Sequence, residues 1–148
     1  MEPAFEPLDG IGLFVLLPAV VMVDTLARAG RARDALALIT RVLDNMSDPK
    51  LGMFVSELWR IRGELIARER GGDTALAEHS LREALRIACG QEAMLLQSRA
   101  GIALASHFAE RGRREEARMA LAECGASALA DRASPEIVAA NRLSAALG

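Results

Sequence analysis

The two histidines and two cysteines are the first candidates for chemistry, since imidazole and thiolate groups are preferred zinc ligands. His79, His107, Cys89 and Cys124 are scattered along the chain, with no close pair at the spacing of a zinc site. His79 lies four residues before Glu83, which predicts an exposed pair along one helix. We predict a partly exposed position for His107 and small, buried, free thiols for both cysteines. No metal site is expected.

Phosphate binding and acid–base catalysis are also not predicted. The Gly71-Gly72-Asp73 turn is too short for a phosphate loop and lacks the Lys-Ser/Thr pair, so it is expected to stop one helix and cap the next. Glu115 and Glu116 are adjacent and project about 100° apart on a helix, so they cannot converge on one substrate. No strand–turn–helix elbow exposes a nucleophilic serine. We therefore expect no enzyme activity, no catalytic residue and no cofactor.

The composition favours a globular, helical domain. The chain has 148 residues, of which 51% are hydrophobic and 26% charged, with no tyrosine and 3% aromatics, so the core must be aliphatic. Alanine, leucine, arginine and glutamate dominate, and all are strong helix formers. The net charge is −2 and arginines alternate with carboxylates, so direct nucleic-acid binding is not expected.

One apolar segment requires a comparison with membrane helices. Ile11 to Val23 is apolar apart from Gly12 and Pro18, but it is shorter than the roughly 20 residues that a membrane span needs. A signal peptide would carry positive charge upstream, where this chain has acidic residues. We expect no membrane association and a cytoplasmic location.

Glycine and proline divide the chain into seven expected helices within a single domain, 1–148. Their approximate ranges are 11–29, 32–46, 51–70, 74–89, 91–111, 113–124 and 135–147. Asp73 is the expected N-cap of the fourth helix, Gly90 its C′ residue, and Pro135 the first residue of the last. The apolar residues recur with the 3.6-residue period and no strand-like alternation appears, so the predicted class is all-α.

The helices also pair into repeats. A glycine-containing turn followed by a helix with an early alanine occurs three times, at Ala35, Ala77 and Ala117. The steps between these alanines are about 42 and 40 residues, a period typical of stacked helical hairpins. The predicted hairpins cover about 11–46, 51–89 and 91–124, and the helix at about 135–147 caps them. A small residue at each position would let the two helices of a hairpin approach closely.

These residues resemble the tetratricopeptide repeat. The second repeat matches the family pattern at Trp59, Gly63, Ile66, Ala77, Leu81 and Ala84; the third at Gly101, Ala105, Phe108, Ala117 and Leu121; the first at Leu26, Ala35 and Ile39. The resemblance implies a right-handed superhelix of about three hairpins, with Trp59 largely buried between them. Because the steps exceed the standard 34 residues, HEAT-like hairpins remain an alternative.

A second resemblance is to the C-terminal helical-repeat arm of bacterial multidomain regulators. The segment from Ser56 to Leu65 is similar to their "ELxRLxGELL" helix, and the stretches Ser80–Leu85 and Ala105–Ala117 also match. Those regulators join a DNA-binding or adenylyl-cyclase-type output domain to an ATPase module. No such module is present here, so the likeness implies an interaction role in a bacterial protein.

In tetratricopeptide arrays the first helix of each hairpin lines a concave groove, and the resemblance transfers that role to charged and polar residues of this chain. The candidate groove residues are Asp24, Arg28, Glu57, Arg60, Glu64, Arg68, Arg99, Ser106 and Glu110. Their mixed signs suggest a peptide or protein partner held by charge-assisted hydrogen bonds. The alternative is that they are solvated helix faces.

The N-terminal apolar run is a second candidate surface. Leu13, Phe14, Leu16 and Leu17 have no preceding helix to cover them, and uncovered apolar patches mark interfaces. Residues 1–10 could fold over this run; otherwise we expect a homodimer that buries it. Taken together, the sequence predicts a protein-interaction module that acts as an adaptor or regulatory subunit. The alternative is a small-molecule or peptide sensor domain of a regulator.

Overall fold

The structure, a computed structural model, describes residues 12–46, 52, 54–69, 71–124 and 135–148. These residues form seven α-helices and no strand, which confirms the all-α class. The helices are α1 (Gly12–Arg28), α2 (Ala32–Asp44), α3 (Val55–Arg68), α4 (Thr74–Gly90), α5 (Met94–Ala109), α6 (Arg114–Glu123) and α7 (Pro135–Leu147). Their bounds lie within a few residues of the predicted ranges, because glycine and proline mark the turns.

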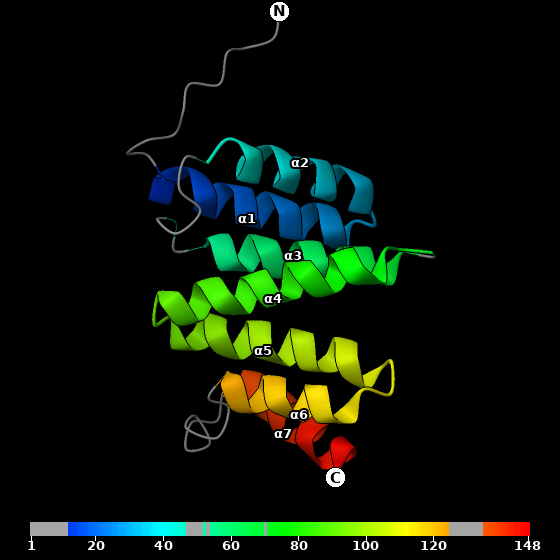
Figure 1. Ribbon diagram of the computed structural model, residues 1–148. Helices are drawn as coiled ribbons and strands as arrows, with labels where there is room; N and C mark the ends of the chain where they lie inside the picture. Colours follow the sequence, from blue (N-terminus) through cyan, green and yellow to red (C-terminus); the bar gives the residue numbers. More distant parts are fainter. Residues whose placement is uncertain (1–11, 47–51, 53, 70, 125–134) are drawn as a thin grey trace, which may run out of the picture.

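The helices pair as hairpins that follow one another in a stack (Figure 1). α1 packs on α2, α3 on α4, and α5 on α6. The first helices of successive hairpins are also in contact, α1 with α3 and α3 with α5, and α5 contacts the closing helix α7. The second helix of a hairpin also contacts the first helix of the following hairpin: α2 contacts α3, and α4 contacts α5. This is the contact pattern of stacked helical hairpins and is compatible with the predicted superhelix.

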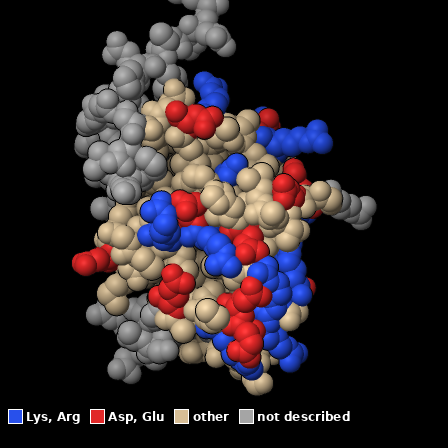
Figure 2. Space-filling model, in the orientation of Figure 1, with Lys and Arg blue, Asp and Glu red and all other residues tan. Residues whose placement is uncertain are grey.

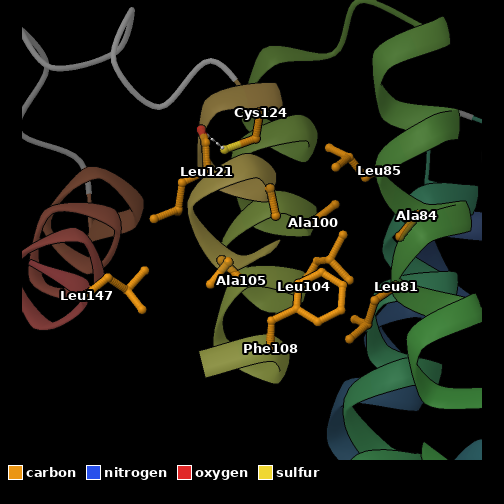
Figure 3. Packing of buried hydrophobic residues seen from close by; sticks show 12 residues of the cluster. Leu81, Ala84, Leu85, Ala100, Leu104, Ala105, Phe108, Leu121, Cys124 and Leu147 are labelled. Atoms are coloured by element: carbon orange, nitrogen blue, oxygen red, sulfur yellow. Dashed lines mark hydrogen bonds between the residues drawn. The ribbon is translucent and has the colours of Figure 1, made fainter. Parts of the chain in front are cut away.

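Two apolar clusters fill the described part of the stack. One joins α1, α2 and α3 through Val23, Ile39 and Leu58, which have no exposed surface. The other joins α4, α5, α6 and α7 around Phe108 and includes Leu147 of the closing helix (Figure 3). Trp59, expected to be largely buried, is only half-buried; it packs against both clusters, so its ring connects the two parts of the core.

Small residues stand where the helices of a hairpin approach most closely. Ala35, Ala77 and Ala117 are completely buried, as the repeat pattern predicts. Two glycines allow a still closer approach: a Cβ on Gly63 would lie 2.6 Å from Cγ of Leu81, and one on Gly101 only 2.2 Å from Cβ of Cys124. The second hairpin helix therefore rests directly on the backbone of the first.

The helix ends follow the predicted turn chemistry with one correction. Gly30, Gly71 and Gly112 each have a φ of 74°, the left-handed conformation that glycine adopts without steric cost. The carboxylate of Asp73 accepts a hydrogen bond from the backbone N–H of Leu76 at 3.0 Å, so this N-cap is confirmed. Gly90 is not the C′ residue.

The correction at Gly90 concerns where α4 leaves the helical conformation. Gly90 is the last residue of α4, and Glu92 takes the left-handed conformation instead, with a φ of 53°. The chain closes this turn with a hydrogen bond from the backbone N–H of Ala93 to the carbonyl of Ala88, at 3.1 Å. This turn also carries a tertiary contact, a hydrogen bond from Nε2 of Gln91 to the carbonyl of Gly52 at 3.0 Å, and tertiary context overrides local residue preferences.

Both cysteines are free thiols; Cys124 is buried in the core and Cys89 is half-buried. Burial, together with the negative charge of Glu123, raises the pKa of the Cys89 thiol.

Among the described helices, none is long and apolar enough to cross a membrane.

Candidate functional site

A pocket of about 520 Å³ opens between the first helices of the second and third hairpins. α3 and α5 form its two walls, α4 contributes Leu81, and α7 contributes Ala139. Six of the predicted groove residues line it: Arg60, Glu64 and Arg68 from α3, and Arg99, Ser106 and Glu110 from α5 and its end. The remaining lining residues are Ala67, Ile102, Ala103 and His107.

A buried carboxylate lies behind one wall of the pocket. Glu57, another predicted groove residue, is only 6% exposed. Arg60 donates one hydrogen bond to each oxygen of Glu57, at 2.7 and 3.0 Å, and a third to Glu64 at 2.7 Å. Arg99 reaches across from α5 to the same carboxylate at 3.4 Å. Glu57 therefore connects the two helices that form the pocket.

These contacts fix the position of the Arg60 guanidinium and stabilise its positive charge. Burial alone would lower its pKa, but the hydrogen bonds and negative charges of Glu57 and Glu64 outweigh burial and raise the pKa. A half-buried guanidinium with two carboxylate partners is a rigid part of the wall.

The structure does not bring the groove residues of the first repeat to this pocket. Asp24 and Arg28 lie on α1, where Arg28 donates to the carboxylate of Asp24 at 2.6 Å. Both side chains are solvent-accessible and neither lines the pocket. They form an ordinary pair along one helix, which contributes little to stability.

His107 corrects a prediction. We predicted a partly exposed position for His107, but the residue is only 3% exposed. It lies on the pocket wall beside Phe108, with 6.0 Å between the two ring centroids. The reason is tertiary: α5 is packed by α3, α4, α6 and α7, so it has no fully solvated face. Neither ring nitrogen has a hydrogen-bond partner within the described residues. A buried imidazole without a hydrogen-bond partner is energetically unfavourable.

Burial lowers the pKa of His107, and the positive charges of Arg111 and Arg113 add to the effect, while Glu78 and Glu110 oppose it. Because the folded pKa is below the unfolded value of about 6.5, the unfolded chain takes up a proton first as the pH falls. The His107 contribution to stability is complete above about pH 6.5 and is lost as the pH falls from there through the folded pKa.

We expect His107→Leu to raise the free energy of unfolding by about 1–2 kcal/mol at pH 7.5, because the unpaired nitrogens are removed. We also expect the variant to lose the stability decrease that the wild type shows as the pH falls below about 6.5. Urea unfolding followed by circular dichroism at pH 7.5 and 5.5 measures both effects. The carboxyl pKa values of Glu78 and Glu83 are also lowered, but these groups change the stability only at lower pH, because unfolded glutamate titrates near 4.3. A destabilised variant, or a wild type equally stable at both pH values, would contradict this account.

The apolar lining residues could not be identified from the sequence as site residues. Ala67, Ile102 and Ala103 face the pocket but occupy positions that the helical period assigns to packing. Ala139 belongs to α7, whose docking against α5 is a long-range contact. The sequence offered only an indirect indication for Ala67, Ile102 and Ala103, which lie one or four positions from predicted groove residues, and none for Ala139.

The predicted self-association surface is only partly described. The side chains of Leu13, Phe14 and Leu16 lie outside the described residues, whereas Leu17 is exposed. Val21 and Met22, further along α1, are both 58% exposed. Self-association through this helix stays a prediction.

Charged side chains on α4 and around the start of α6 pair with one another. Arg86 donates to Glu83 at 2.8 Å, and Arg113 reaches across to Glu78 at 2.6 Å. The hydrogen bond from Arg113 holds the pKa of the Glu78 carboxyl below its usual range. Figure 2 shows basic and acidic side chains interleaved over the visible face, without a continuous field of either sign.

The described residues contain no group of three or more His, Cys, Asp or Glu side chains that could hold a metal ion. His79 is exposed and packs edge-on against the ring of Trp59, with 6.0 Å between centroids. Comparison of the chain with protein-family models, curated proteins and solved structures found no match.

Proposed function

We propose that this chain is a non-catalytic protein-interaction module, an adaptor or regulatory domain that binds a peptide segment in the pocket between α3, α5 and α7. The observation that carries the proposal is the gathering of Arg60, Glu64, Arg68, Arg99, Ser106 and Glu110 around one cavity. A volume of about 520 Å³ falls within the range of ligand-binding pockets. Such a cavity suits a few side chains of an extended peptide better than a flat protein surface.

Pre-organisation of the charged wall supports the same function. Arg60 is held by Glu57 and Glu64, and Arg99 contacts Glu57, so the polar groups are ordered before a ligand arrives. Pre-ordered groups lose less conformational entropy on binding, which increases affinity. The resemblance to tetratricopeptide arms of bacterial regulators also supports an interaction role, in a bacterial and cytoplasmic setting.

A small-molecule sensor is the second candidate function, and His107 is the observation that favours it. Its buried ring nitrogens have no partner within the described residues, although the ring borders the pocket. Ligand sites combine an apolar lining with a few polar groups that fix orientation. In that case the occupied pocket would transmit the presence of the ligand to a partner domain.

Selection of peptides from a random displayed library on the purified chain tests the main proposal. We expect enriched peptides whose affinity falls at least about tenfold in Ser106→Arg, since the long side chain fills the pocket. The matched control is Arg86→Glu, an exposed position on α4 outside the pocket lining, which should bind the same peptides unchanged.

Two results would reject peptide binding at this pocket. One is an absence of enriched peptides, which would favour the sensor alternative. The other is a set of peptides that bind Ser106→Arg as well as the wild type, which would move the binding surface elsewhere on the molecule.

A further inference from the structure

Two opposite charges at the rim of the pocket have no ion-pair partner closer than 4.0 Å among the residues that the structure describes. Arg68 is 76% exposed, and its nearest carboxylate is Glu64 at 4.0 Å. Glu110 is 74% exposed, and its nearest guanidinium is Arg111 at 4.0 Å. At 4.0 Å neither pair makes a hydrogen bond. Both rim groups keep their hydrogen-bonding capacity for a ligand.

The other charges at the pocket are already engaged. Arg60 hydrogen-bonds two carboxylates, Glu64 accepts one of these bonds, and Arg99 contacts Glu57. Among the described residues, the three lining arginines are matched by three carboxylates, Glu64, Glu110 and Glu57 behind the wall, so these side chains carry no net charge when His107 is neutral. A purely anionic ligand would meet Glu64 and Glu110, and a purely cationic one would meet the arginines. Like-charge contacts of this kind are unfavourable and reject such ligands.

The two rim charges lie on the same edge of the stack. Arg68 is the last residue of α3, and Glu110 directly follows α5. α3 and α5 run in the same direction and are in contact, so their carboxyl ends lie at the same edge (Figure 1). The pocket between them has small apolar groups on its walls, including Ala67 and Ala103.

We propose that the pocket selects a peptide segment carrying both an anionic and a cationic group, with the anion against Arg68, the cation against Glu110, and a small aliphatic group between them. This inference rests on the proposed peptide-binding function and specifies its ligand chemistry. The two charges are supplied either by the free termini of a short peptide or by side chains of a longer segment.

Isothermal titration with three defined probes tests the proposal and distinguishes the sources. The first is unblocked tri-alanine, which carries both terminal charges. The second is an acetylated, amidated peptide with one glutamate and one lysine separated by two alanines. The third is an acetylated, amidated alanine peptide without charge. We expect one of the first two to bind at least about tenfold more tightly than the third, because each charge-assisted hydrogen bond contributes measurably to affinity.

Charge reversal on the protein assigns the contacts. Arg68→Glu and Glu110→Arg should each weaken binding of the preferred probe by roughly tenfold or more. The double variant, which exchanges the two charges, should recover most of the affinity, since a zwitterionic ligand can bind in the reverse orientation. Both side chains are exposed, so the fold should tolerate the changes, and a thermal melt of each variant checks this.

The proposal is overturned if the neutral peptide binds as well as the charged ones, if neither reversal changes affinity, or if neither charged probe binds. Each of these outcomes leaves the proposed peptide-binding function intact when library-selected peptides still bind the wild type and lose affinity in Ser106→Arg. Failure of that selection would instead reject the binding function itself.

Discussion

Gly101→Ala is expected to lower the free energy of unfolding by about 2–3 kcal/mol, although alanine is the better helix former. A Cβ on Gly101 would lie 2.2 Å from Cβ and 2.6 Å from Sγ of Cys124, and 3.2 Å from the carbonyl oxygen of Ala120. The Cβ of Cys124 is fixed to its backbone, so the contact can be relieved only by moving α6 away from α5. That movement would disrupt the packing around Phe108 and Leu121.

The matched control for this substitution is Gly90→Ala. Gly90 also lies in a helix, but a Cβ there would meet no atom within 4 Å. Without a clash, only the gain in helix propensity remains, and we expect stabilisation of up to about 1 kcal/mol. Urea unfolding of both variants by circular dichroism measures the difference. A Gly101→Ala protein as stable as Gly90→Ala would show that α5 and α6 are not in backbone contact at this point.

Trp59→Ala is the second substitution with a large expected effect, a loss of about 3 kcal/mol, the lower end of the range for tryptophan because the ring is half-buried. Trp59 packs against both apolar clusters, so its removal leaves a cavity between the second hairpin and its neighbours. The guanidinium of Arg62 also lies over the ring, 5.2 Å from its centroid, and would lose that contact.

Trp59→Phe separates the ring's packing from its polar group. The indole N–H of Trp59 is buried without a hydrogen-bond acceptor within the described residues. Phenylalanine keeps much of the apolar contact and removes the unpaired donor, so we expect a change within about 1 kcal/mol. Chemical unfolding followed by circular dichroism suits both variants, since neither retains tryptophan fluorescence. A loss below about 1 kcal/mol for Trp59→Ala would mean that the ring does not bridge the two clusters.

Both positions bear on the pocket, because its walls belong to different hairpins. α3 and α5 meet through the same core that Trp59 joins, and α5 is held on its other side by α6 and α7. Variants that loosen these contacts would also alter the spacing of the charged side chains on α3 and α5. Binding measurements on the pocket should therefore use substitutions at exposed positions.

Local chemistry in the sequence was sufficient for the helical class and most of its boundaries. The turns at Gly30, Gly71 and Gly112 require left-handed backbone conformations, and Asp73 caps α4 as its side chain predicts. α7 begins at Pro135, also as predicted. These features depend on φ preferences and hydrogen bonds within a few residues, so the sequence alone determines them. The complete burial of Ala35, Ala77 and Ala117 follows from the repeat in the same way.

Which charges form a site depends on packing between helices that are distant in the sequence. Arg60, Arg68, Arg99 and Glu110 meet because α3 packs beside α5, whereas Asp24 and Arg28 pair on α1 away from the pocket. The burial of His107 and of Glu57 likewise depends on neighbouring helices that are distant in the sequence. A helical period identifies the apolar face of one helix, but it does not determine how many neighbours cover that helix. That number decides whether a polar residue is solvated, paired or left buried at a pocket wall.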